Sequence, residues 1–166
     1  MPSRVLCDGW DGTVSSKLHG KATMTPQELV SHAVELLLAQ DTVGFAGLWA
    51  EDGVVEFPFA APGYPARVEG RAAVTEYMRG YPDVLKIEEI PEPVMHQSVD
   101  PEVVIVEFEA SGIVVATGAP YRMSYIAVIT VRNNEIQRYR DYWSPLAAAE
   151  AMGGMQQLSA FSGVDQ

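Results

Sequence analysis

The sequence has little basic charge, a single cysteine and no long apolar run. Eleven Lys and Arg residues face 22 Asp and Glu residues among 166, for a formal net charge of −11. A chain this acidic repels phosphate backbones and anionic lipid surfaces, so we expect no nucleic-acid partner and no membrane partner. The longest apolar run, Ala33 to Ala39, is interrupted by Glu35 and is far shorter than the roughly 20 residues of a membrane span. The expected ligand is therefore neutral, apolar or cationic.

The scarcity of cysteine also limits the chemistry that the chain can carry. Cys7 has no second cysteine with which to form an intramolecular disulfide, and a cysteine-rich metal site is excluded. A reduced, cytoplasmic setting fits this composition. The sequence shows neither a glycine-rich phosphate loop nor a pair of His or acidic residues at metal-ligand spacing on one strand face. We therefore expect no metal and no cofactor.

The composition indicates one globular domain between two tails. Apolar residues make up 48% of the chain and charged residues 20%, which is typical of a folded domain. Residues 1–23 lack a periodic apolar pattern and are predicted to be a flexible N-terminal tail. Residues 24–153 are predicted to form the domain, and residues 154–166 a C-terminal tail.

The first third of the domain reads as helical. Thr25 and Glu28 form a capping box with Pro26 at the first helical position, which predicts a helix from there. Asp41 is placed to cap a second, short helix, and an extended run is expected over residues 54–59, after Asp52-Gly53. A third helix is expected to open at Glu69-Gly70-Arg71 and to stop at Gly80 and Pro82.

After Pro82 the apolar period changes from that of a helix to that of a strand. Strands are expected near residues 84–90, 94–99, 103–117, 121–131 and 136–143, followed by a helix near 145–152. Gly112, inside the longest of these runs, suggests a bulge or bend. Helices and strands are thus segregated, which predicts the α+β class. A strongly bent antiparallel sheet over three helices would make a cone that encloses a pocket.

The segment from Ile136 to Pro145, with its aromatic-Arg-Asp-aromatic-aromatic core, resembles the last strand of the NTF2-like superfamily. More narrowly it resembles the SnoaL-like polyketide cyclases, the PhzA/PhzB proteins and limonene-epoxide hydrolase. Residues 48–53 resemble the family's helix-to-strand junction, and residues 68–71 the start of its third helix. The resemblance covers about residues 25–152 and implies the cone-shaped fold and a homodimer. It leaves the reaction open, because this fold hosts unrelated activities.

The resemblance also implies roles for particular positions. The acid on the last strand of these enzymes corresponds to Asp141. The Arg and Asp that the epoxide hydrolase carries on its long strand fall on Phe108 and Ala110, and its water-holding Tyr and Asn fall near Val55 and Phe57. The resemblance therefore implies a pocket acid without the water-activating residues of the hydrolase.

Strand alternation gives an independent reason to single out Asp141. Side chains alternate across a strand, so Asp141 shares one face with Tyr139 and Trp143. Among apolar neighbours the charged form is disfavoured, so the pKa of the carboxyl group should rise and make it a proton donor near neutral pH. The alternative is that Asp141 is structural and caps a backbone amide or pairs with Arg140 or His96.

Two further residues are candidates for catalysis, and eight are candidates for the pocket wall. Tyr139 could orient a substrate oxygen, and His96 could relay a proton, although a lone His is more often structural. The candidate substrate-binding residues are aromatic or soft apolar side chains, which could equally be ordinary core: Trp49, Phe57, Tyr77, Phe108, Tyr121, Met123, Tyr125 and Trp143. On the opposite sheet face we expect an ion-pair ladder of Glu107, Glu109, Arg122, Arg138 and Arg140.

These observations lead to one leading hypothesis and two alternatives. The chain is expected to be a cofactor-independent enzyme that closes or isomerises a ring of an apolar, polyketide-like or terpenoid-like metabolite by acid/base catalysis. The first alternative is a binding module that holds an apolar small molecule without chemistry. The second is an epoxide-opening hydrolase or cyclase, which Phe108 and Ala110 disfavour.

Overall fold

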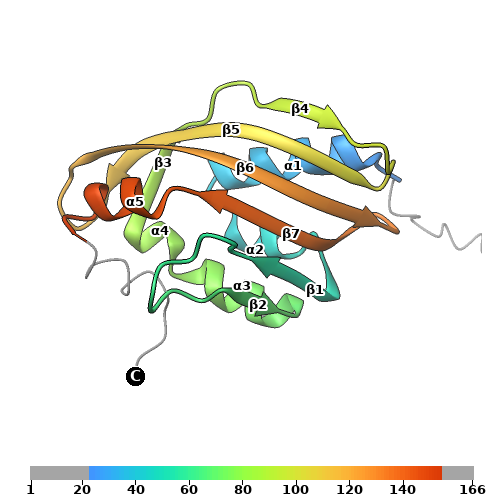
Figure 1. Cartoon of the computed structure of the whole chain (residues 1–166), viewed down its shortest axis with the longest axis horizontal. Coiled ribbons are helices and arrows are strands. Elements are labelled where there is room, and N and C mark those ends of the chain that lie inside the picture. The colour runs from blue at the N-terminus through green and yellow to red at the C-terminus, as the bar shows by residue number, and fades with distance from the viewer. Residues whose placement is uncertain (1–22, 155–166) are drawn as a thin grey trace, which may run out of the picture.

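A curled sheet wraps over a layer of helices in the computed structural model, which describes residues 23–154 (Figure 1). The predicted tails lie outside these residues, apart from residues 23 and 154 themselves, and so does Cys7. In chain order the elements are α1 (Pro26–Leu38), α2 (Thr42–Ala46), β1 (Trp49–Glu56), β2 (Arg67–Glu69), α3 (Arg71–Arg79), α4 (Tyr81–Val84), β3 (Leu85–Glu89), β4 (Val94–Gln97), β5 (Val103–Val114), β6 (Pro120–Arg132), β7 (Glu135–Trp143) and α5 (Pro145–Ala151). No helix in this part of the chain is long and apolar enough to cross a membrane.

The predicted helix starts are confirmed by their capping interactions. The backbone N–H of Thr25 donates to Glu28 Oε2 at 2.7 Å, and the N–H of Glu28 donates to Thr25 Oγ1 at 3.2 Å. Asp41 Oδ1 accepts from the N–H of Gly44 at 2.8 Å and begins α2. These bonds satisfy amide groups that a helix leaves free at its start, so the local sequence fixes where each helix begins.

The sheet has the strand order β2-β1-β7-β6-β5-β3, and β4 pairs with a further part of β5. Figure 1 shows the long strands β5 and β6 arching over α1, with α4 and α5 at one end of the arch. All pairings are antiparallel except that of β1 with β7, which is parallel and was not predicted. The α+β class and the NTF2-like cone are confirmed.

The start of the first strand was predicted wrongly. Asp52-Gly53 does not end the helical unit but lies inside β1, where the register against β7 shifts between Trp49 and Val54. A Cβ atom at Gly53 would lie 2.7 Å from the carbonyl oxygen of Ile136, so only glycine fits this close approach. The pair therefore marks a bulge within a strand and not a turn before one.

Two short elements were absent from the sequence prediction. The strand β2 adds an edge to β1, with Val68 opposite Val55. The helix α4 follows Gly80, where the sequence predicted a stop, because Pro82 falls in its first turn, where the missing N–H costs nothing. This helix carries Tyr81 to the wall of the pocket described below.

The predicted alternation along β6 is confirmed. Tyr121, Met123, Tyr125, Ala127 and Ile129 are buried, and the intervening residues from Arg122 to Val128 face away from the core. The buried face packs in the core, in which Trp49 and Ile136 are also fully buried. This alternation decides that the side chains of the same parity on β7 point toward the helices.

The opposite face carries ion pairs, but not as one ladder. Arg122 bonds Glu109 at 2.9 Å, as expected for a cross-strand pair. Glu107 instead bonds His96, and Arg138 bonds Glu56 at 2.7 Å. Among residues 23–154 Arg140 has no ion pair, so the predicted ladder is only partly correct. The reason is that β1 and β4 bring in acidic and basic partners that the prediction had not placed beside β7 and β5.

Single neutral substitutions on this face should change stability little. We expect Glu107→Gln and Glu109→Gln each to lower the free energy of unfolding by about 1 kcal/mol or less, because exposed ion pairs are screened by water. Urea unfolding of the two variants beside the unsubstituted protein measures this. A loss of more than about 2 kcal/mol in either would contradict a purely surface role.

Candidate functional site

Two cavities lie side by side between the sheet and the helices. The α5 cavity has a volume of about 50 Å³, and the core cavity a volume of about 70 Å³. Four residues border both of them: Tyr77, Tyr81, Tyr125 and Asp141. The α5 cavity is completed by Tyr64, Leu85, Met123, Trp143, Ala148, Ala151 and Met152. The core cavity is completed by Leu37, Phe45, Trp49, Val55, Phe57, Val74, Met78, Ile87, Phe108, Ala110 and Tyr139.

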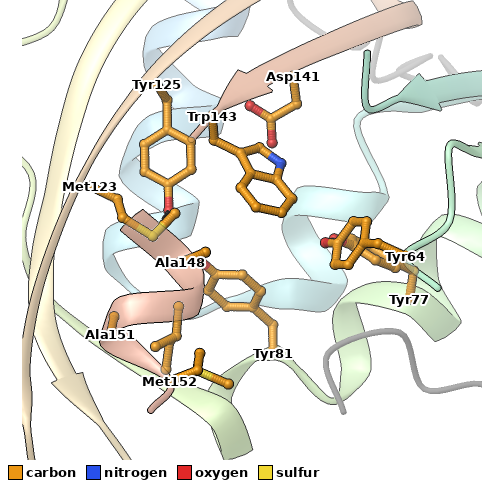
Figure 2. A pocket seen from close by; sticks show the side chains of 11 residues that line it. Tyr64, Tyr77, Tyr81, Met123, Tyr125, Asp141, Trp143, Ala148, Ala151 and Met152 are labelled. Carbon is orange, nitrogen blue, oxygen red and sulfur yellow. Dashed lines mark hydrogen bonds between the residues drawn. The ribbon is translucent and has the colours of Figure 1, made fainter. Parts of the chain in front are cut away.

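Asp141 stands between the two cavities with an unsatisfied oxygen. It is paired with Ala127 in the register of β6 and β7, and its side chain points from β7 into the pocket (Figure 2). The residue as a whole is partly accessible, but its Oδ1 atom exposes less than 1 Å² and has no hydrogen-bond partner in the described chain. A buried oxygen without a partner is costly, which is a sign of a site kept for a ligand.

The surroundings of Asp141 favour its neutral form. Burial raises the pKa of its carboxyl group from 3.8 to about 7. Neither Arg140 nor His96 forms an ion pair with it in residues 23–154, so the predicted structural alternative of such a pairing is not seen. No Lys, Arg or His lines either cavity in this part of the chain. The carboxyl group can therefore give or take a proton close to neutral pH.

Five tyrosines surround this carboxyl group. The hydroxyls of Tyr64 and Tyr77 are hydrogen-bonded to each other, and the hydroxyl of Tyr125 donates to Met123 Sδ at 4.0 Å. The other two are Tyr81 and Tyr139, and the latter stacks on Trp49 with 5.7 Å between ring centroids. Burial raises the pKa of each of the five, and the nearby Asp141 charge raises it further. All five hydroxyls therefore stay protonated and act as neutral hydrogen-bonding groups.

Most of the predicted site residues do lie around the cavities. They are Asp141 and Tyr139 among the catalytic candidates, and Trp49, Phe57, Tyr77, Phe108, Met123, Tyr125 and Trp143 among the binding candidates. Phe108 stacks on Tyr125 at 4.9 Å, which holds the latter ring in place. The structure thus brings the acid and the aromatic wall together.

Two predicted site residues lie elsewhere. His96 is exposed on β4, with its Nε2 2.8 Å from Glu107 Oε1, so the structure corrects its assignment to the pocket. β4 pairs with β5 at a point where the alternation turns His96 outward. Tyr121 is buried on the pocket-facing side of β6 but borders neither cavity. Alternation along a strand predicts on which face of the sheet a side chain lies, but it does not predict how far along the cone the residue lies.

Sequence reasoning missed part of the wall. Tyr64 comes from the loop between β1 and β2, where its ring meets Trp143 edge-on at 5.1 Å. Tyr81 comes from the unpredicted α4, and Ala148, Ala151 and Met152 come from α5 and its end. Figure 2 shows α5 closing the cavity opposite Trp143 and Tyr125. The available signal for Tyr64 was an aromatic residue within residues 60–65, which otherwise consist of Pro, Gly and Ala.

The positions that correspond to the hydrolase's water-activating residues line the core cavity, but their side chains are hydrocarbon. They are Val55, Phe57, Phe108 and Ala110. A hydroxyl, amide, carboxylate or guanidinium would be needed there to hold and activate a water molecule. In the described chain there is also no cluster of three His, Cys, Asp or Glu side chains that could bind a metal ion.

The fold and the site define an NTF2-like cone whose apolar pocket contains one buried acid. The sequence profile of the SnoaL-like domain matches residues 30–139, and the chain belongs to this family. It is 45% identical to protein YesE of Bacillus subtilis (strain 168) over 71% of this chain and 80% of that one. It is 35% identical to the PhzA/B-like protein PA3332 of Pseudomonas aeruginosa, over 80% of this chain and 94% of that one.

Solved structures share the fold. One from Bacillus subtilis, provisionally named an isomerase, is 41% identical with a TM-score of 0.74, over 79% of this chain and 97% of that one. More distant structures share the fold alone. One is a provisionally named polyketide cyclase from Pseudomonas putida, 21% identical with a TM-score of 0.68 over 78% of this chain and 98% of that one. Another is SalBIII, an epoxide hydrolase/cyclase-like enzyme of salinomycin pyran-ring formation, 19% identical with a TM-score of 0.61 over 72% and 90%. A third, from Catenulispora acidiphila, has a ketosteroid isomerase-like fold and is in complex with trimethylamine; it is 17% identical with a TM-score of 0.64 over 79% and 95%.

Proposed function

We propose that this protein is a cofactor-independent enzyme in which Asp141 acts as general acid in a ring closure or an isomerisation. The observation that carries the proposal is the Asp141 carboxyl group itself, which is buried and has an unpartnered Oδ1 atom and a pKa of about 7. The names of the isomerase and cyclase neighbours agree with this reaction type. The names of the more distant neighbours mention chemically different compounds, trimethylamine and salinomycin. They therefore do not identify a substrate class for this chain.

The proposed reaction moves protons and needs no oxidant or reductant. Asp141 gives its proton to a carbonyl, hydroxyl or epoxide oxygen of the substrate while the new bond forms. The carboxylate then takes back the proton that the substrate loses elsewhere, so product and substrate are isomers. The hydroxyls of Tyr64, Tyr77, Tyr81 and Tyr125 would orient the oxygen beside the acid, because all four residues line the α5 cavity.

The substrate proposed here is apolar and polyketide-like or terpenoid-like, in keeping with the aromatic wall. Such molecules need pockets of about 300 Å³ or more, whereas neither cavity exceeds about 70 Å³. We infer that α5 moves away from the sheet to admit the substrate, because this helix closes the α5 cavity. Ala148 and Ala149 of α5 are buried and Met152 packs against the core, so this movement must break those contacts.

The test is a comparison of turnover with binding in Asp141→Asn. The protein would be incubated with a panel of apolar 1,3-diketones and hydroxy-epoxides. Proton NMR would detect the conversion of any of these compounds to an isomer. We expect the substitution to lower turnover by about a hundredfold or more while the substrate still binds. Asp83→Asn, which makes the same change at an exposed residue of α4, is the matched control and should retain turnover. Equal turnover in both variants would refute the role of Asp141.

A binding role without chemistry is the second candidate. It is favoured by one observation: apart from tyrosines, Asp141 is the single titratable side chain that lines the cavities in the described chain. In that case a compound would bind to the unsubstituted protein and to Asp141→Asn, and neither protein would convert it.

A further inference from the structure

The pocket combines features that suit a positive charge. Five of the eleven residues that line the α5 cavity are aromatic: Tyr64, Tyr77, Tyr81, Tyr125 and Trp143. The face of an aromatic ring carries partial negative charge and attracts a cation within about 6 Å. No basic side chain from residues 23–154 lines either cavity to repel one. The formal charge of −11 on the whole chain further raises the local concentration of cations.

The buried carboxyl oxygen supplies a specific partner. Asp141 Oδ1 exposes less than 1 Å² and accepts no hydrogen bond from the described residues, although it points into the pocket (Figure 2). An N–H group of an ammonium ion could donate to this atom in a short, charge-assisted hydrogen bond. The same bond would remove the cost of leaving a buried acceptor unpaired.

The cavity volumes limit the size of the cation. A cavity of about 150 Å³ binds benzene, which has six heavy atoms, so about 25 Å³ serves each atom. By this measure the α5 cavity of about 50 Å³ holds about two heavy atoms, and the core cavity of about 70 Å³ about three. An ion of four heavy atoms that reaches Asp141 therefore needs the space of both cavities, which share Tyr77, Tyr81, Tyr125 and Asp141 in their walls.

We propose that the Asp141 pocket binds a small N-methylated ammonium ion that keeps an N–H group, with trimethylammonium as the best fit. The N–H donates to Asp141 Oδ1, and the methyl groups lie against the rings of Tyr81, Tyr125 and Trp143. This is a proposal about binding and does not rest on the catalytic role of Asp141. A cation bound in this way holds Asp141 ionised, so it would also inhibit any reaction that needs the acid.

The binding should depend on pH because the cation prefers the ionised carboxylate. The titratable groups that face Asp141 are Tyr64 from the β1–β2 loop, Tyr77 from α3, Tyr81 from α4, Tyr125 from β6 and Tyr139 from β7. Burial raises the pKa of all five, so none of them ionises between pH 6 and pH 8. With a pKa of about 7, Asp141 goes from about one-tenth to about nine-tenths ionised over this range. The apparent affinity should rise about tenfold.

The experiment is an NMR titration of the full chain with trimethylammonium chloride at constant ionic strength, at pH 6 and pH 8. The indole N–H of Trp143 reports on the cavity. tert-Butanol, a neutral molecule of similar shape, is the ligand control. We expect saturable binding of the ion that is about tenfold tighter at pH 8, and weaker binding of tert-butanol that does not change with pH. Asp141→Asn should weaken binding of the ion at pH 8 at least tenfold, and Asp83→Asn should leave it unchanged.

Three outcomes would overturn the proposal: no saturable shift at either pH, equal affinity for the ion and for tert-butanol, or unchanged binding of the ion by a folded Asp141→Asn variant. A melting curve of each variant establishes that it is folded. Binding of the ion without turnover of any neutral compound would count against the proposed enzyme alone. Turnover without binding of the ion would count against the present proposal alone.

Discussion

Asp141→Asn is expected to stabilise the protein at pH 8 and to change its stability little at pH 4. The folded-state pKa of Asp141 is about 7, against 3.8 for the free group. Between these values the native state holds a proton that the unfolded state has released, so the free energy of unfolding falls as the pH rises. The loss is complete above pH 7 and amounts to at most about 4 kcal/mol, from the difference in pKa.

Thermal melts of both proteins from pH 4 to pH 8 measure this effect. The asparagine side chain has no proton to release, so its curve should stay flat where that of the unsubstituted protein falls. At pH 8 the gain should be about 2–4 °C for each kcal/mol, reduced by the cost of burying unpaired amide N–H groups. Asp83→Asn should follow the unsubstituted protein throughout. A variant that melts lower at pH 8, with an NMR titration of Asp141 centred below pH 4, would make Asp141 a structural, ionised residue.

Gly112→Ala is expected to cost about 3 kcal/mol, as when an extra group is forced into a packed structure. A Cβ atom at this position would lie 1.9 Å from the carbonyl oxygen of Lys86, which is backbone and cannot rotate away. The residue is paired with Ile87, beside the register shift between β3 and β5. Alanine must therefore push β3 away from β5. Leu85 and Ile87 of β3 line the two cavities, so the pocket should loosen as well.

Urea unfolding gives the loss of stability, and an NMR titration of Asp141 reports on the pocket. We expect the pKa of Asp141 to fall toward its ordinary value in Gly112→Ala as water enters. Gly80→Ala is the control, because nothing lies within 4 Å of a Cβ atom there and the backbone φ of −83° suits alanine. It should be neutral or slightly stabilising. A loss below about 1 kcal/mol in Gly112→Ala would show that β3 shifts freely.

The sequence predicted the parts of the fold that depend only on interactions between neighbouring residues, such as the starts of the first two helices. Thr25 and Asp41 satisfy amide groups of their own helices, so their roles do not depend on the rest of the chain. Asp52-Gly53 misled the prediction because the same pair suits a turn and a bulge. Which of the two forms depends on Ile136, which is more than eighty residues away in the sequence and against which Gly53 packs. The start of β1 is therefore determined by pairing with a distant strand and not by the conformational preferences of neighbouring residues.

The sequence predicted which strand side chains point into the pocket, but not how far along the cone each of them lies. Alternation along a strand sufficed to place Asp141, Tyr139 and Trp143 on the pocket face. It could not give the depth of a residue in the cone, so Tyr121 was assigned to the wall although it borders neither cavity. Tyr64 lies on a loop, whose position follows from what it packs against, in this case Phe57 and Trp143. No periodic pattern in the sequence reports such contacts.

The position of β7 has a consequence for the order in which the protein assembles. This strand is the last of the sheet to be synthesised, yet it lies between β1 and β6. Until it emerges from the ribosome, β1 and β2 have no sheet to join and one edge of β6 is unpaired. Contacts between segments so distant in sequence form slowly and leave strand edges exposed meanwhile. The acid of the pocket lies on the same strand, so Asp141 enters the pocket in the same step that joins β1 and β2 to the rest of the sheet.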